Sequence, residues 1–202
     1  MNLVFVHGWG SGPFVWQEML HDFEACHPRI INMGFLGEED FTMPEGQFIG
    51  VGHSLGGLWL LKHYPDQMSG FVSIASFNSF YDHIPSHILT AMKRNIIKDT
   101  SSQLKDFWHY AGLDQPGGFK NLNPGKLLEG LGWLSKWKAD IPENLPLKIL
   151  ASRDDHIVPE KMTNNIWGKH TIDWIDQGGH MLPITQPEWC NKHLKEFIGQ
   201  IE

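Results

Sequence analysis

The sequence predicts an α/β fold with a minimal, mostly parallel sheet of about six strands and an inserted helical cap. The 202-residue chain opens with a continuous apolar run at 3–6, which is typical of a strand buried on both faces of a parallel sheet. Further short apolar runs alternate with segments of helical spacing, as in α/β proteins. Residues 78–140 break this rhythm, since they contain helical patches and no convincing strand.

The expected elements follow in order along the chain. Strands are expected where apolar residues run together between turn-forming residues, at 3–6, 29–33, 47–52, 71–75, 147–151 and 171–175. Helices are expected at 14–25 and 187–201 from their amphipathic spacing, and at 58–64, a largely apolar segment closed by Pro65. Residues 34–46 are rich in Gly, Glu and Pro and are expected to form a loop.

The domain organisation follows from the inserted segment. Residues 1–77 and 141–202 are the expected core, and residues 78–140 are the expected cap. The cap and its border are dense in aromatic residues, namely Phe77, Phe80, Phe107, Trp108, Phe119, Trp133 and Trp137. Nine Trp and twelve Phe in so short a chain indicate an apolar pocket as well as a core.

Composition excludes several classes of protein. Hydrophobic residues at 41% and charged residues at 19% describe a globular chain, not a disordered or fibrous one. The formal net charge of −7 argues against nucleic acid or an anionic membrane as the main partner. Two Cys, no basic leader and no run of apolar residues long enough to span a membrane favour a cytoplasmic location.

The strongest local signal is Gly-His-Ser-Leu-Gly at 52–56, between an expected strand and an expected helix. A tight strand-to-helix turn exposes the Ser54 hydroxyl, and the flanking glycines prevent clashes at the turn. Ser54 is therefore the candidate nucleophile. The alternative interpretation is a tight turn without chemistry.

A serine nucleophile needs a base and an acid that orients the base. His180 lies in a Gly-rich loop just past the last expected strand, where the base belongs in this chain order. The acid is expected after the fifth strand, where the Asp-x-x-Val-Pro spacing favours Asp155. Asp154 is expected to cap the turn and remains an alternative acid, and Asp176 is a weaker third choice.

Residues 7–10, His-Gly-Trp-Gly, follow the first strand and are placed to complete an oxyanion hole. The backbone N–H groups of Trp9 and Leu55 are the candidate donors to the carbonyl oxygen of a bound ester, and the Trp9 indole is expected to wall the pocket. The alternative is a Gly-rich turn with a packing Trp.

Cofactor sites are not favoured by the sequence. Glycines at 8, 10 and 12 follow a strand, but Pro13 stands where a dinucleotide-binding motif needs its last glycine. The twelve His are scattered without metal-ligand spacing, so no metal is expected. Serine-based ester hydrolysis requires no cofactor.

Together these residues resemble the α/β-hydrolase superfamily, whose nucleophile, acid and base motifs fall on Ser54, Asp155 and His180. The resemblance covers the chain apart from parts of the cap. It implies a carboxylester hydrolase. Its sheet is expected to lack the two strands that in this superfamily customarily come before the strand leading into residues 7–10. It also implies an apolar acyl chain held under the cap, for which the candidate contacts are Trp9, Phe107, Trp108 and Trp133.

Within the superfamily, the sequence is most similar to the esterases that act on pimeloyl-acyl-carrier-protein methyl ester in biotin synthesis. The similarity rests on the segments 7–10, 52–57, 128–134, 155–159 and 179–188. In that family, basic cap residues recognise the acidic carrier protein. The candidates for this contact are Lys93, Arg94 and Lys98, with Lys105 beside them.

Three other functions share these motifs. A general short-chain carboxylesterase differs only in its substrates. A thioesterase or acyltransferase would use the same three residues on a thioester or with an acceptor other than water. A binding protein without activity is the alternative from another class, although it has no need to retain Ser54, Asp155 and His180 together.

Overall fold

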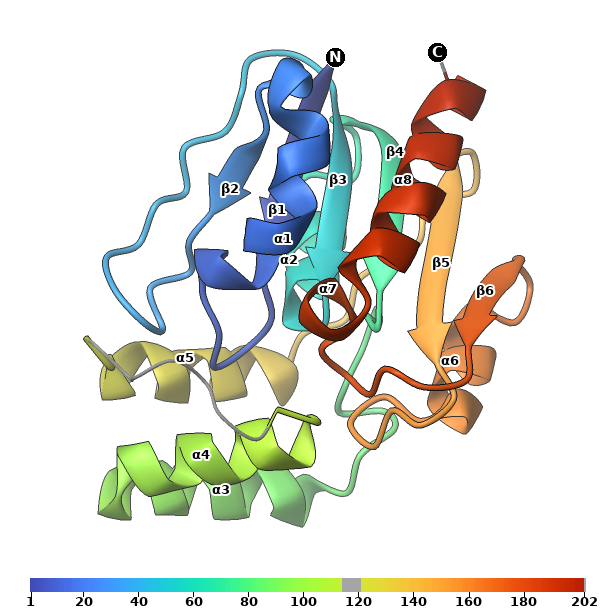
Figure 1. Ribbon diagram of the computed structural model, residues 1–202. Coiled ribbons are helices and arrows are strands. Elements are labelled where there is room, and N and C mark those ends of the chain that lie inside the picture. The colour runs from blue at the N-terminus through green and yellow to red at the C-terminus, as the bar shows by residue number, and fades with distance from the viewer. Residues whose placement is uncertain (114–120, 202) are drawn as a thin grey trace.

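The computed structural model describes residues 1–113 and 121–201, so that Phe119 lies outside the described residues. Six strands form one sheet in the order β2-β1-β3-β4-β5-β6, and every pair is parallel (Figure 1). The strands are β1 (Asn2–Val6), β2 (Arg29–Ile31), β3 (Phe48–His53), β4 (Met68–Ile74), β5 (Leu147–Ser152) and β6 (Ile172–Ile175). This arrangement confirms the predicted fold class.

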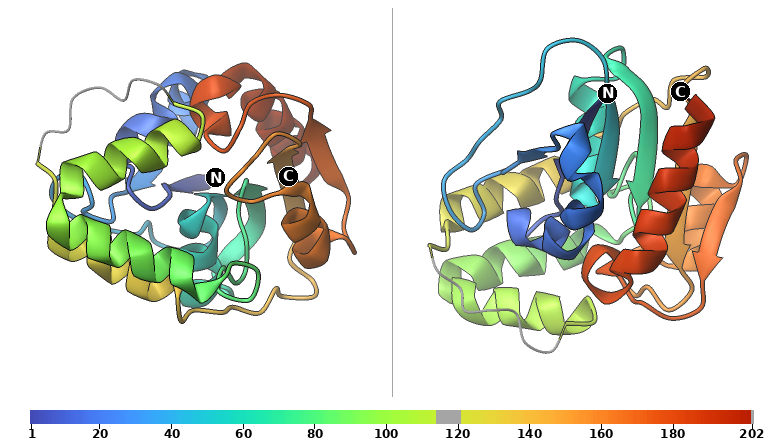
Figure 2. Two further views of the ribbon diagram at one scale, coloured as in Figure 1. Left: turned by 90° about the horizontal axis from the view of Figure 1, so that it is seen from below. Right: turned by 45° about the horizontal axis from the view of Figure 1, so that its top comes forward.

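Helices cover both faces of the sheet. Short α1 (Gln17–Leu20) and the C-terminal helices α7 (Leu182–Thr185) and α8 (Pro187–Ile201) lie on one face, and α2 (Leu55–His63) and α6 (Glu160–Trp167) lie on the other (Figures 1 and 2). Burial on both faces explains why β3 is buried at all its positions and reads as a continuous apolar run. The segment expected as one helix at 14–25 is α1 between two 3-10 turns, Pro13–Trp16 and His21–Cys26.

Three further helices stand between β4 and β5 in the chain. They are α3 (Ser86–Lys98), α4 (Thr100–Tyr110) and α5 (Pro124–Leu134), and they lie beyond the carboxyl ends of the strands (Figure 1). This inserted layer is the helical cap of the predicted fold class. Ligands of parallel α/β sheets bind at the carboxyl ends of the strands, so the cap covers the edge where a site is expected.

Two glycines allow α2 to pack directly on the sheet. A Cβ at Gly52 would lie 2.4 Å from Gly57 Cα, and a Cβ at Gly56 would lie 2.0 Å from the carbonyl oxygen of Val6. These distances are shorter than van der Waals contact allows. The turn between β3 and α2 can therefore approach β1 this closely only because these positions carry no side chain.

We expect Gly56→Ala to lower the free energy of unfolding by about 3 kcal/mol or more, because the added methyl group meets backbone rather than a movable side chain. Gly132→Ala in α5 is the matched control, since no atom lies within 4 Å of its added Cβ. The control should stabilise the protein by about 0.5–1 kcal/mol, the helix-propensity gain of Ala over Gly. Urea unfolding of both variants measures the difference, and equal stability would contradict the close approach.

His7 joins the loop after β1 to the loop after β2. Its side chain is fully buried, with Nδ1 2.9 Å from the Gly8 carbonyl oxygen, while the backbone N–H of Met33 donates to Nε2 at 3.1 Å. These partners assign the neutral imidazole with its proton on Nδ1. Burial lowers the pKa of His7 from 6.5 to about 4.

We therefore expect the protein to lose stability in mildly acidic solution. Between pH 6.5 and about 4 the unfolded chain carries a proton on His7 that the folded chain does not, so the free energy of unfolding falls as the pH falls. The loss from this residue is on the order of 3 kcal/mol. Urea unfolding across this interval should give a shallower pH slope for His7→Asn than for the wild type, and an unchanged slope would contradict the assignment.

Candidate active site

Ser54 stands at the turn between β3 and α2 with a left-handed backbone, φ 53°. Residues other than Gly rarely adopt this conformation, and it persists where surrounding contacts enforce it. The Ser54 N–H donates to the carbonyl oxygen of Ile74 at 3.1 Å. Its own carbonyl oxygen accepts from the Ser76 hydroxyl at 2.6 Å and from the Gly57 N–H at 3.1 Å. The turn is thus held from both sides.

His180 lies between Ser54 and Asp155. Its Nε2 is 3.0 Å from Ser54 Oγ, and its Nδ1 is 2.8 Å from Asp155 Oδ2. The side chains of His180 and Asp155 are each only 1% exposed. In this arrangement the imidazole is positioned to take the hydroxyl proton, and the carboxylate is positioned to stabilise the resulting imidazolium.

The Asp155 carboxylate is kept ionised despite its burial. Burial acts to raise its pKa, but the charge and hydrogen bond of His180 and two backbone N–H groups together lower the pKa below its usual value. The backbone donors are Ile157 at 2.7 Å and Val158 at 2.9 Å, both to Oδ1. Oδ2 therefore remains directed at the imidazole.

Asp154 points to the loop that carries His180 and not to the imidazole. Its Oδ1 accepts from the N–H of Gly179 at 2.8 Å and of Gly178 at 3.1 Å, and also from the Ser152 hydroxyl. Pairing of Ser152 with Ile175 between β5 and β6 brings these two loops together. The contact is thus a long-range clamp, where the sequence predicted only a local turn cap.

Two further contacts fix the backbone of His180. Nε2 of His53 lies 2.9 Å from the His180 carbonyl oxygen, so the residue before Ser54 also holds the candidate base. The His180 N–H donates to the carbonyl oxygen of Ala111, just past α4, at 3.3 Å. The candidate base is therefore attached to the sheet on one side and to the cap on the other.

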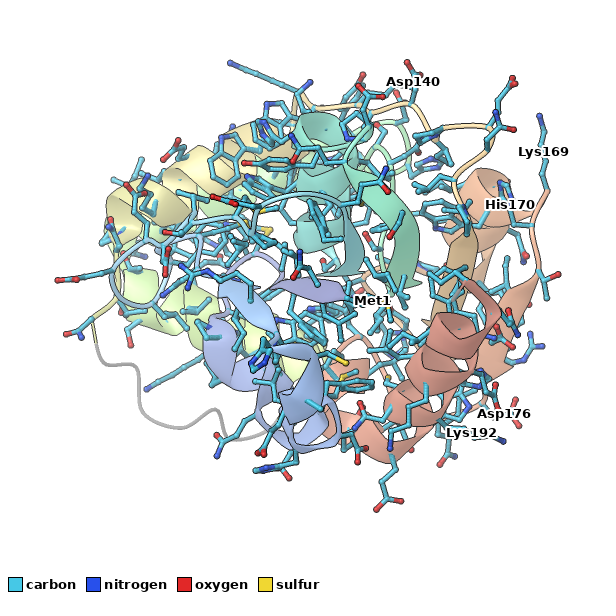
Figure 3. The ribbon with its side chains drawn as sticks, turned by 90° about the horizontal axis from the view of Figure 1, so that it is seen from above. Met1, Asp140, Lys169, His170, Asp176 and Lys192 are labelled. Atoms are coloured by element: carbon cyan, nitrogen blue, oxygen red, sulfur yellow. The ribbon has the colours of Figure 1, made fainter. Side chains whose placement is uncertain are left out.

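Asp176, the third candidate acid, lies at the periphery. Figure 3 shows it at the outer edge of the molecule, and its side chain is 92% exposed, with Oδ1 3.4 Å from Arg153 Nε. The structure does not bring it to His180.

The loop at 7–10 lies against the candidate nucleophile. Pairing of β1 with β3, which ends with Val6 opposite Gly52, places the two following loops side by side, and a Cβ at Gly8 would lie 2.9 Å from Ser54 Cβ. Neither the Trp9 nor the Leu55 N–H has an acceptor within residues 1–113 and 121–201. Leu55 opens α2, where the first N–H groups have no partner within the helix.

An apolar cavity of about 370 Å³ opens beside Ser54, with Trp9 and Phe107 in its lining. The Trp9 indole is fixed by a 2.9 Å hydrogen bond to the carbonyl oxygen of Leu127 in α5, and the Phe107 ring meets it edge-on at 4.8 Å. Most of the remaining wall is aliphatic or aromatic, including Phe77, Phe80, Ile88, Leu89, Met92 and Leu134.

The other two aromatic residues proposed as substrate contacts do not line this cavity. The Trp108 indole N–H donates to the carbonyl oxygen of Gly10 at 2.7 Å, because a buried indole needs an acceptor. Trp133 stacks on Trp137 with ring centroids 4.8 Å apart. Both residues attach the cap to the core or complete its packing.

The basic residues proposed for carrier contact lie on the cap. Arg94 and Lys98 are exposed and one turn apart on α3, and Lys105 is exposed on α4. Lys93 is half-buried and donates to the Ser135 hydroxyl at 3.3 Å. Arg94, Lys98 and Lys105 thus have accessible charge, whereas Lys93 is tied to the end of α5.

The sequence reasoning missed the contribution of α3 to the cavity. Ile88, Leu89 and Met92 form the cavity face of this helix. Leu89 and Met92 follow Ile88 by one and four positions, which indicates an apolar helix face. The same spacing is also found in helices packed on a core, so it did not identify a cavity wall.

Within the part of the chain that the structure describes, no helix has the length and apolar character needed to cross a membrane. No group of three or more His, Cys, Asp or Glu side chains is arranged there to hold a metal ion.

Curated relatives are similar over nearly the whole chain. A pimeloyl-[acyl-carrier protein] methyl ester esterase of Vibrio atlanticus is 25% identical over an alignment 243 residues long. The alignment covers 97% of this chain and 93% of the relative. The enzyme of the same name from Vibrio cholerae is 26% identical over 242 residues, with the same coverage of both chains.

Solved structures share the fold. A hydrolase from Oleispira antarctica superimposes with a TM-score of 0.77 at 15% identity, covering 98% of this chain and 90% of that chain. A thermophilic esterase from Thermogutta terrifontis superimposes with a TM-score of 0.69 at 13% identity, covering 100% and 90%. The profile of the alpha/beta hydrolase family matches residues 3–193. The chain therefore belongs to the alpha/beta hydrolase family.

Proposed function

We propose that this carboxylic ester hydrolase works through an acyl-enzyme on Ser54, and that its substrate is the methyl ester of a pimeloyl chain carried on acyl-carrier protein. The observation that carries the mechanism is the hydroxyl of Ser54, 3.0 Å from His180 Nε2 and open to an apolar cavity. The substrate assignment is supported by the names of the curated relatives.

In the first half-reaction, Ser54 Oγ attacks the ester carbonyl carbon while His180 Nε2 takes the hydroxyl proton. The N–H groups of Trp9 and Leu55 donate to the oxyanion that forms. The bond to the alcohol oxygen then breaks, and His180 returns its proton to that oxygen. Methanol leaves, and the acyl group remains on Ser54.

In the second half-reaction, His180 takes a proton from water, and the hydroxide attacks the acyl-enzyme. The same two N–H groups hold the second oxyanion. Its collapse releases the carboxylic acid, and Ser54 regains its proton from His180. Asp155 stabilises the imidazolium in both halves.

The cavity and the cap surface fit different parts of such a substrate. The apolar lining beside Ser54 suits a methylene chain. The exposed charges of Arg94, Lys98 and Lys105 offer a local complement to an acidic carrier, although the whole chain is acidic.

We expect Asp155→Asn to lower kcat by about 10⁴-fold, because an amide in contact with Nδ1 favours the wrong imidazole tautomer. Asp154→Asn retains a carbonyl acceptor for the Gly179 N–H. Its kcat should therefore fall only about tenfold, in the range of one charge-assisted hydrogen bond. Steady-state hydrolysis of p-nitrophenyl butyrate measures both variants. The reverse ranking would assign the acid role to Asp154.

We expect kcat/KM to be far higher for pimeloyl-acyl-carrier-protein methyl ester than for p-nitrophenyl butyrate, and to fall with salt for the carrier substrate alone, since salt screens contacts between exposed charges. Ser54→Ala should reduce both activities by several orders of magnitude while the protein stays folded. Equal rates on both substrates without salt dependence would instead identify a general short-chain esterase. Retained activity of Ser54→Ala would refute the acyl-enzyme mechanism.

A further inference from the structure

The cavity has few polar side chains. Apart from Ser54 and the indole of Trp9, these are Gln103, Asp106 and the phenol of Tyr110, whose residue is 59% exposed. The last three share one face of α4 with Phe107, since positions three, four and seven residues apart on a helix point the same way. No Lys, Arg or His belongs to the part of the lining that the structure describes.

Gln103 is buried, with 8% of its surface exposed. Its Oε1 accepts a hydrogen bond from Asn95 Nδ2 of α3 at 2.9 Å, which fixes the amide in the wall between the two helices. The amide nitrogen has two N–H donors, and within residues 1–113 and 121–201 the hydrogen bond of the Gln103 side chain is the one that its oxygen accepts. Because Gln103 lines the cavity, its N–H donors are available to a ligand that brings an oxygen atom.

Asp106 is exposed and carries the only charge in the described lining. A second carboxylate entering this cavity would lose its hydration, meet no cation and approach a group of the same charge. A single neutral donor such as Gln103 cannot offset these costs. A neutral carbonyl group loses less hydration than a carboxylate and is not repelled by Asp106. It can still accept a hydrogen bond from Gln103.

We propose that Gln103 determines specificity, so that the cavity accepts acyl chains ending in an uncharged, hydrogen-bond-accepting group and rejects chains ending in a free carboxylate. This inference rests on the proposed function and narrows it. A dicarboxylic acyl chain is then a substrate only while its far end is masked as an ester, amide or thioester.

Three methyl esters with the same acyl length test the proposal. These are methyl heptanoate, monomethyl pimelate and dimethyl pimelate, assayed near neutral pH where the free carboxyl of monomethyl pimelate is ionised. The wild type should cleave dimethyl pimelate, counted per ester group, about threefold to tenfold faster in kcat/KM than methyl heptanoate, the range of one neutral hydrogen bond. Monomethyl pimelate should be slower than dimethyl pimelate by about 100-fold or more.

Gln103→Leu should abolish the preference for dimethyl pimelate over methyl heptanoate, measured as the ratio of the two kcat/KM values in the same preparation. Met92→Leu is the matched control, since it changes the same cavity wall without removing a polar group, and it should keep the wild-type ranking. Equal rates on mono- and dimethyl pimelate, or an unchanged preference in Gln103→Leu, would overturn the inference.

Failure of the proposed function has a different signature. If the wild type cleaves p-nitrophenyl butyrate but its rates on the three methyl esters follow a different order, only the role of Gln103 is overturned. The acyl-enzyme mechanism then stands. A wild type that cleaves none of the four compounds overturns both.

Discussion

The close packing of the β3–α2 turn on β1 is the constraint on which the candidate site depends. Gly56 lies so near the Val6 carbonyl oxygen that no side chain fits between them. This contact brings the loop after β1 against Ser54, so that the candidate nucleophile and the N–H groups of Trp9 and Leu55 share one small region. Without it, the two loops would be separated by at least the thickness of a side chain.

The candidate base is positioned from a different direction. His180 follows the last strand, and its loop is held by Asp154 through backbone N–H groups and by His53 through a carbonyl oxygen. Two adjacent carboxylates thus have separate tasks, because Asp155 orients the imidazole and Asp154 orients the backbone that carries it. The Asp155 pKa stays low through donors that the fold supplies, which keeps its charge available at the buried site.

Much of the fold could be predicted because strands buried on both faces read as continuous apolar runs, as β1 and β3 do. The nearness of Ser54, Asp155 and His180 was also predictable, since parallel strands bring their following loops to one edge. Helix α6 was missed although its buried residues, Met162, Thr163 and Trp167, lie on one helical face, because eight residues give too short a pattern to read with certainty. The orientation of Trp108 depends on the carbonyl oxygen of Gly10, 98 positions away, which no local pattern reveals.

The hydrogen bond from the His180 N–H to the carbonyl oxygen of Ala111 has a further consequence. Ala111 follows α4, the helix that also carries Phe107 and Gln103 into the cavity wall. Any displacement of the end of α4 would therefore strain or release the backbone of the candidate base. Packing of an acyl chain against α4 would in turn favour the position of Ala111 that holds His180 in place, so that the free energies of the two contacts are coupled.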